Sequence, residues 1–209
     1  GHYDSCLVSV TAWPTGSRYL GFTSDTHYET GAVNNLDNWL TNVGALYPSI
    51  DYMGLCGDMA STSSASVTQY WQFVQAMVDT VNDHDDFVTD GGIYTTGNHE
   101  MYSGPIAGGN YDSVKNTNAT AMLITQIGVS EANDDYIIYT FGACNDVTTS
   151  RVQAFTEAQI DALETYLEGA PDDIPIFIMS HYPLHYDGNR VAERSEDVIT
   201  VLNEHPNVV

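Results

Sequence analysis

The chain has 209 residues, of which 43% are hydrophobic and 16% charged, a composition typical of a globular domain with its own core. Asp and Glu outnumber Lys and Arg by 28 to 5, so the formal net charge is −23 at pH 7. A chain this acidic, with Lys115 as its only lysine, offers no basic surface to a phosphodiester backbone, and this argues against nucleic acid as a partner.

No apolar stretch is long enough to cross a bilayer, so we expect no transmembrane segment. The scarcity of lysine and the abundance of aspartate are typical of secreted proteins or of proteins from salty surroundings, and from the first of these we expect an extracytoplasmic location. Cys6, Cys56 and Cys144 are an odd set, which excludes a full disulfide framework. We expect buried thiols, with a Cys6–Cys144 bridge as the alternative.

Short apolar runs alternate with helical patterns along the chain, and this alternation predicts an α/β fold. Helical spacing of apolar residues stops at Pro48, and Thr156 with Gln159 forms a capping box at the start of a later helix. The expected strands are 19–22, 52–56, 93–96, 136–143 and 174–179. The expected helices are 36–47, 67–81, 156–169 and 193–204. Residues 100–135 are rich in Gly, Asn and Ser, and they predict a long loop with one short helix near Met122.

Four of the expected strands end in side chains that can bind a metal ion. Carboxylate and imidazole groups suit Zn, Fe or Mn, and ligands in α/β proteins bind beyond the carboxyl ends of strands. We therefore expect these groups to converge, with Gly57 and Gly97 allowing the backbone to approach the site closely. The groups are Asp25, His27, Asp58, Asn98, His99 and His181.

Each segment alone has an ordinary explanation, because Gly-Asp and Asn-His are common in turns and loops. Four such segments in this order, each after an apolar run, are hard to obtain by accident. His185 follows the His181 segment closely, and we expect it to face the substrate.

The ordered set "SDTH", "GD", "GNHE" and "SHYP" resembles the calcineurin-like metallophosphoesterase superfamily over nearly the whole chain. The resemblance implies a single domain over residues 1–209, with a four-layer αββα sandwich and a dinuclear metal centre that hydrolyses phosphate mono- or diesters. It also implies the roles of the site residues. Asp25 and His27 would hold the first ion, Asp58 would bridge both, Asn98 and His181 would hold the second, and His99 would serve the leaving group.

The chain departs from the family pattern twice. Ser61 stands where relatives often have Asp or Asn, three residues after the bridging Asp58. The Gly-His-x-His block that completes the family's metal sites does not occur. Val208 and Val209 look like the opening of another strand, so we expect a domain truncated before its last strands, with an exposed sheet edge that invites oligomers. The alternative to truncation is a divergent member that never had this block. The alternative to an enzyme is a non-catalytic or fragmentary binding module with an incomplete metal site.

Overall fold

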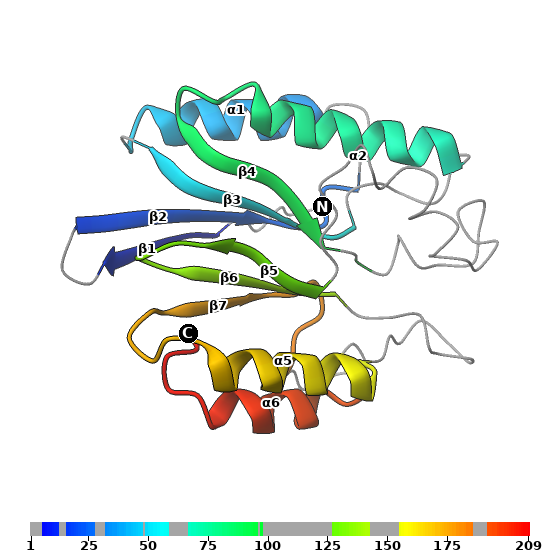
Figure 1. The fold of residues 1–209 in the computed structure, drawn as a ribbon. Coiled ribbons are helices and arrows are strands. Elements are labelled where there is room, and N and C mark those ends of the chain that lie inside the picture. The colour runs from blue at the N-terminus through cyan, green and yellow to red at the C-terminus, as the bar shows by residue number, and fades with distance from the viewer. Residues whose placement is uncertain are drawn as a thin grey trace.

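The computed structural model describes residues 6–12, 16–27, 32–47, 49–58, 67–95, 97, 127–142, 155–185 and 192–209. Two β-sheets lie face to face, and helices cover the outer face of each sheet (Figure 1). The layers run helix, sheet, sheet, helix, which confirms the predicted four-layer α/β fold. In the described part of the chain, no helix is long and apolar enough to cross a membrane.

The first sheet has the strand order β1-β2-β3-β4. Its strands are β1 (Cys6–Ala12), β2 (Gly16–Thr23), β3 (Ile50–Cys56) and β4 (Val88–Thr95). The last three are parallel, and α1 (Ala32–Gly44) and α2 (Val67–Asn82) connect them. These strands and helices confirm the predictions for this half. The sequence analysis did not identify β1, which pairs antiparallel with β2 at the edge of the sheet.

The second sheet has the order β5-β6-β7, with β5 (Ile127–Ala132) antiparallel to β6 (Ile137–Phe141) and β7 (Ile176–Met179) parallel to it. The prediction of a continuous loop over 100–135 was wrong at β5. A bulge between Val129 and Glu131 interrupts the alternation of this strand, and pairing with β6 holds it in place. The short helix expected near Met122 lies outside the described residues.

The predicted helices of the second half are α5 (Glu157–Gly169) and α6 (Ser195–Asn203). The predicted capping box opens α5, because Thr156 Oγ1 accepts a hydrogen bond from Gln159 N at 3.3 Å and Gln159 Oε1 accepts one from Thr156 N at 2.7 Å. Buried side chains of α5 then pack against the second sheet: Ile160, Leu163 and Leu167.

A separate hydrophobic core holds the two sheets together. Leu20 and Tyr52 from the first sheet pack with Ile138 and Met179 from the second, and all four are at most 3% exposed. This contact places the ends of β2 and β3 next to the end of β7, although β7 belongs to the other sheet. Burial of apolar surface therefore decides which strand ends meet.

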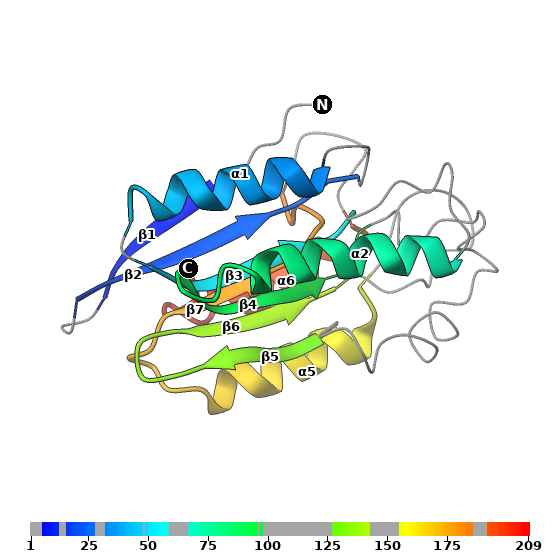
Figure 2. The same cartoon turned by 90° about the horizontal axis from the view of Figure 1, so that it is seen from above.

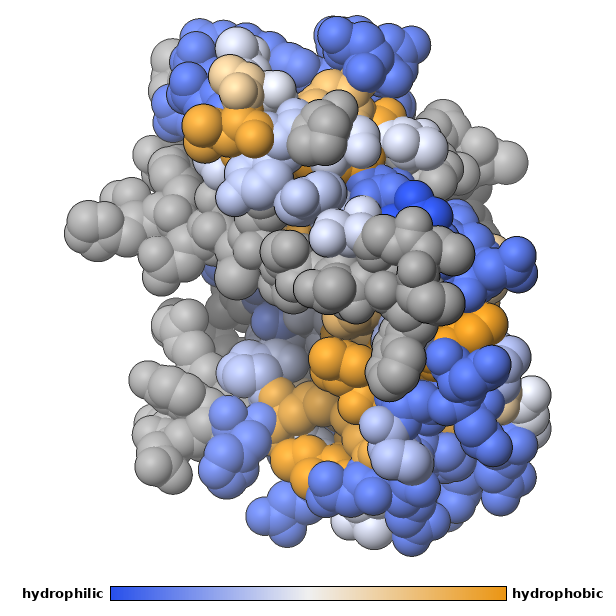
Figure 3. All heavy atoms as spheres, turned by 90° about the vertical axis from the view of Figure 1, so that its left-hand side faces the viewer, coloured by the Kyte–Doolittle hydropathy of each residue, from blue (hydrophilic) through white to orange (hydrophobic). Residues whose placement is uncertain are grey.

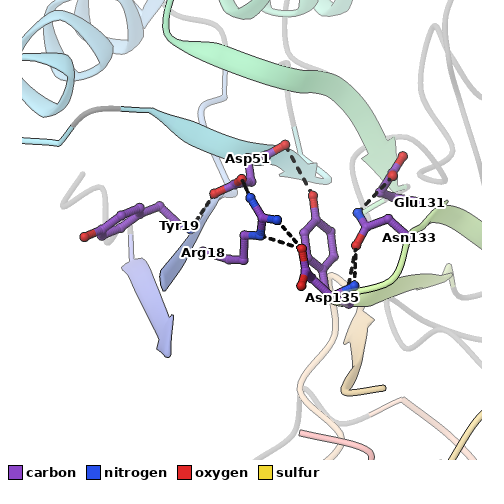
Figure 4. Close-up of polar contacts among 7 residues, drawn as sticks. Arg18, Tyr19, Asp51, Glu131, Asn133 and Asp135 are labelled. Carbon is purple, nitrogen blue, oxygen red and sulfur yellow. Dashed lines mark hydrogen bonds and ion pairs between the residues drawn. The ribbon is translucent and has the colours of Figure 1, made fainter. Parts of the chain in front are cut away.

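An ionic cluster also joins the sheets, at the end where β2 and β3 begin (Figure 4). Arg18 Nη1 donates to Asp51 Oδ1 at 3.1 Å within the first sheet, and Arg18 Nε donates to Asp135 Oδ2 at 2.8 Å in the β5–β6 turn of the second. The hydrogen bond with Asp135 raises the pKa of Arg18. Both carboxylates are largely buried, at 16% and 15% exposed, so they depend on this guanidinium.

Replacing Arg18 with alanine should lower the free energy of unfolding by about 2 kcal/mol, because two largely buried carboxylates lose their cation. Urea denaturation measures this change. The matched control is Arg194→Ala, since Arg194 pairs with the exposed Asp197 and should cost less than about 0.5 kcal/mol. Equal unfolding midpoints for the two variants would contradict the role given to the cluster.

The last residues lie beside β7. Ile176 N donates to Asn207 O at 2.8 Å, and Val209 N donates to Ile176 O at 2.9 Å, so Val208 pairs with Ile176 as in a parallel sheet. Figure 3 looks onto the face where the parallel strands begin, and hydrophobic side chains gather in its lower half. Val209 is 75% exposed. Oligomerisation through a sheet edge stays a prediction.

Candidate metal centre

The strands β2, β3, β4, β6 and β7 point the same way, so their carboxyl ends lie on one side of the molecule (Figures 1 and 2). Asp25 and His27 follow β2, Asp58 follows β3 and His181 follows β7. The first three come from one sheet and His181 from the other. The site therefore forms where the edges of both sheets meet, and it depends on the packing between them.

These four predicted residues lie within a few ångströms of one another. His27 Nε2 is 3.5 Å from Asp25 Oδ1 and 3.8 Å from Asp58 Oδ2. His181 Nε2 is 3.6 Å from the same oxygen, Asp58 Oδ2. One oxygen of Asp58 thus lies close to both imidazoles, and the Asp58 side chain is only 2% exposed.

The loops that follow β2 and β3 have an unusual backbone conformation, and hydrogen bonds hold them together. Asp25, His27 and Asp58 have positive φ angles of 55°, 46° and 52°, a region that costs non-glycine residues about 1–3 kcal/mol each. Two hydrogen bonds offset this cost, from Asp25 N to Gly57 O at 3.1 Å and from His27 N to Asp58 O at 3.0 Å. Strained residues that are held in this way often mark a functional site.

Gly57 and Gly97 allow the close approach that the sequence predicted. Gly57 has φ of 82°, and a Cβ atom on it would lie 2.5 Å from Gly97 N. A Cβ atom on Gly97 would lie only 2.2 Å from Asp58 Oδ1. Since real Cβ contacts are longer than 3.0 Å, the chain can pass beside the Asp58 carboxylate here only as glycine.

A backbone carbonyl orients the His181 ring. His181 Nδ1 lies 2.7 Å from Cys56 O, and a carbonyl oxygen can only accept, so Nδ1 carries the proton. In the neutral ring, Nε2 then has the free lone pair, and this is the nitrogen that faces Asp58. Metal-binding histidines are commonly oriented in this way, by a hydrogen bond from the nitrogen that does not bind the ion.

The Asp25 carboxylate is ionised at neutral pH. Burial raises the pKa of Asp25, but hydrogen bonds from His27 and Ser24 and the nearby charges of His181 and His27 together lower it to about 2. The site thus presents an anionic carboxylate oxygen at neutral pH. A carboxylate beside neutral imidazoles suits a divalent ion.

The Cys56 thiol forms no disulfide, and it is buried and unreactive. Burial, with the negative charge of Asp25 nearby, raises the pKa of this thiol to about 12. Since the thiolate is the reactive form, Cys56 stays protonated and unreactive across the neutral range. The expected buried thiol is confirmed at this position. The side chains of Cys6 and Cys144 lie outside the described part of the structure.

In the folded protein, Cys56 should therefore resist a thiol reagent at pH 8. The test uses the Cys6→Ser, Cys144→Ser variant, in which Cys56 is the only thiol, and follows its reaction with a chromogenic disulfide reagent. We expect little reaction in buffer and complete reaction in denaturant, because unfolding returns the thiol to its ordinary pKa. Rapid reaction of the folded variant would contradict this environment.

Not all predicted residues can be placed. Asn98, His99 and Ser61 lie outside the described residues. His185 is described and exposed, and its role toward substrate stays a prediction. The sequence analysis gave no role to two groups that the structure brings into the site, the Ser24 hydroxyl and the Cys56 carbonyl. Ser24 stands beside Asp25 in the quoted motif, whereas a backbone carbonyl has no sequence signal.

The residues present fit a metal ion. Asp25, His27 and Asp58 each offer a ligand atom, and these atoms lie within 4.8 Å of one another. His181 Nε2 lies 3.6 Å from Asp58 Oδ2. A cation held by these groups would place positive charge beside a nearly fully buried carboxylate, where such charge is most favourable.

Known proteins resemble this chain in sequence and in fold. The sequence model of the calcineurin-like phosphoesterase family matches residues 19–208. No curated protein matches. A crystal structure of a dimetal phosphatase from Danio rerio has a similar fold, with a TM-score of 0.60 and 15% sequence identity over 91% of this chain and 78% of that one. A phosphopantetheinyl hydrolase from Mycobacterium tuberculosis is less similar, with a TM-score of 0.45 and 17% identity over 79% of this chain and 68% of that one.

The ordered motifs, the four-layer fold and the convergence of Asp25, His27, Asp58 and His181 agree with that match, which spans most of the chain. The expected resemblance is thereby confirmed, and with it a metal-dependent phosphoesterase activity in general terms. The chain belongs to the calcineurin-like phosphoesterase family.

Proposed function

We propose that this protein hydrolyses a small or surface-presented phosphate ester at a dinuclear metal centre. Asp25, His27 and Asp58 hold the first ion, and Asp58, Asn98 and His181 hold the second. The ions are Zn, Mn or Fe, which suit a set of carboxylate, imidazole and amide ligands. The acidic, lysine-poor composition supports an extracytoplasmic location for this reaction.

The observation that carries the proposal is the position of the Asp58 carboxylate. It is buried, and its Oδ2 atom lies 3.8 Å from His27 Nε2 and 3.6 Å from His181 Nε2. These two imidazoles are assigned to different ions by their motifs. A carboxylate this close to both imidazoles could serve both ions, as a bridging ligand must.

When bound, ions held by these residues would supply the chemistry that activates a water molecule and stabilises charge on phosphoryl oxygens. The protein's own groups hold the ligands in place. The Cys56 carbonyl fixes the proton of His181 on Nδ1, and the glycine at position 97 leaves room for Asp58. His99 supplies a proton to the leaving oxygen, in keeping with its place in the family motif.

Hydrolysis of chromogenic phosphate esters tests this proposal. The metal-stripped protein is assayed with p-nitrophenyl phosphate and bis(p-nitrophenyl) phosphate, after addition of Mn²⁺, Zn²⁺ or a chelator. We expect turnover with a metal ion and none with the chelator. Hydrolysis that chelation does not affect would contradict a metal centre, and metal binding without any hydrolysis would favour the non-catalytic binding module.

His99→Ala should keep the metal content and lower turnover by about 10²–10⁴-fold, the usual contribution of a general acid. The loss should be greatest on esters with poor leaving groups, because these need the proton most. His205→Ala is the matched control, since His205 lies beyond α6, far along the chain from the motifs. If His99→Ala loses metal instead, His99 is a ligand and not the acid.

A further inference from the structure

The Ser24 hydroxyl lies among the candidate ligands, between groups from both sheets. Its Oγ atom donates a hydrogen bond to Asp25 Oδ2. The same oxygen lies 3.1 Å from Cys56 O and 3.4 Å from His181 Nδ1. Ser24 thus contacts one candidate ligand from the first sheet, one from the second, and the carbonyl that orients the second.

The available protons decide how these contacts are arranged. Ser24 has one hydroxyl proton, while Asp25 Oδ2 and Cys56 O can only accept. Charge-assisted hydrogen bonds to a carboxylate are stronger than those to a neutral carbonyl, so the proton goes to Asp25 Oδ2. Cys56 O is then left to accept from His181 Nδ1, which is 2.7 Å away.

This arrangement fixes which atoms face the metal. With Oδ2 of Asp25 bonded to Ser24, the other oxygen, Oδ1, is the one that faces His27 Nε2 at 3.5 Å. With Nδ1 of His181 bonded to Cys56 O, Nε2 faces Asp58 Oδ2 at 3.6 Å. A single hydroxyl therefore helps to orient ligands of both proposed ions.

We propose that Ser24 is a positioning residue of the metal centre. Its hydroxyl occupies one oxygen of Asp25, so that Asp25 binds through the other, and its contacts with Cys56 O and His181 Nδ1 help to hold the His181 ring in place beside Asp25. The proposal rests on the proposed function, because it assumes that these residues bind metal ions. Loss of a hydrogen-bonding partner of a metal ligand typically lowers metal affinity by about 10–100-fold.

The test compares Ser24→Ala, Ser24→Thr and the control Ser17→Ala, which removes an exposed hydroxyl at the other end of β2. Calorimetric titration of each metal-stripped full chain with Mn²⁺ gives the affinity. The absorption spectrum of bound Co²⁺ reports the ligand geometry, and thermal unfolding of the metal-free form reports stability.

We expect Ser24→Ala to bind Mn²⁺ about 10–100-fold more weakly and to change the Co²⁺ spectrum, with little change in metal-free stability. Ser24→Thr keeps the hydroxyl and should recover most of the affinity, and Ser17→Ala should match the wild type. If Ser24→Ala fails to fold, Ser24→Gly takes its place.

Two results would overturn the inference while the proposed function stands: a Ser24→Ala variant with wild-type affinity and Co²⁺ spectrum, or a loss of affinity that only follows a loss of metal-free stability and is not rescued by Ser24→Thr. A wild-type protein that binds no divalent ion would instead overturn the proposed metal centre, and this inference with it.

Discussion

Replacing Asp58 with alanine should remove both metal ions from the protein. Asp58 is the buried carboxylate close to both His27 and His181, so its loss takes a ligand from each proposed ion. We expect affinity to fall by more than about 100-fold, beyond the effect typical of a residue that only supports a ligand. Elemental analysis of the purified variant and titration with Mn²⁺ measure the change.

The metal-free fold should survive this substitution, because it removes a buried negative charge instead of creating one. Asp58→Asn keeps the side-chain volume and should lose the ions as well, since a neutral amide is a poor bridge. Asp161→Ala is the matched control, as it removes an exposed carboxylate from α5. Asn98→Ala should weaken mainly the second ion. Full metal content in both Asp58 variants would exclude Asp58 from the site.

Gly97→Ala should weaken metal binding, although Gly97 is not itself a proposed ligand. The added methyl group would lie 2.2 Å from Asp58 Oδ1 and 2.6 Å from Asp58 N, so either the carboxylate or its backbone must move. Overpacking of this kind costs about 1–3 kcal/mol of unfolding free energy. Because Asp58 is displaced, metal affinity should fall together with stability.

The matched control for this substitution is Gly169→Ala, at the end of α5. A Cβ atom there meets nothing within 4 Å, and alanine is the better helix former, so stability should stay equal or rise by up to about 1 kcal/mol. Urea denaturation and Mn²⁺ titration of both variants make the comparison. Wild-type affinity and stability in Gly97→Ala would mean that the segments carrying Gly97 and Asp58 can move apart at little cost in free energy.

Local patterns in the sequence were sufficient for the elements that depend on neighbouring residues. The periodicity of α1 and α2 and the capping box of α5 arise within one or two helical turns, and the structure has all three. The strand β5 was missed because its bulge breaks the alternation that marks a strand. The strand β1 was missed because its place depends on pairing with β2.

The order of the motifs, the types of ligand and, through them, the family follow from the sequence alone. Which of these groups meet depends on how the two sheets pack. His181 reaches Asp58 because the buried apolar contact between Tyr52 and Met179 packs β3 of the first sheet against β7 of the second. These two strands are far apart in the chain. The roles of Ser24, Gly97 and the Cys56 carbonyl likewise arise from contacts between distant segments, and no local pattern encodes a distance across the fold.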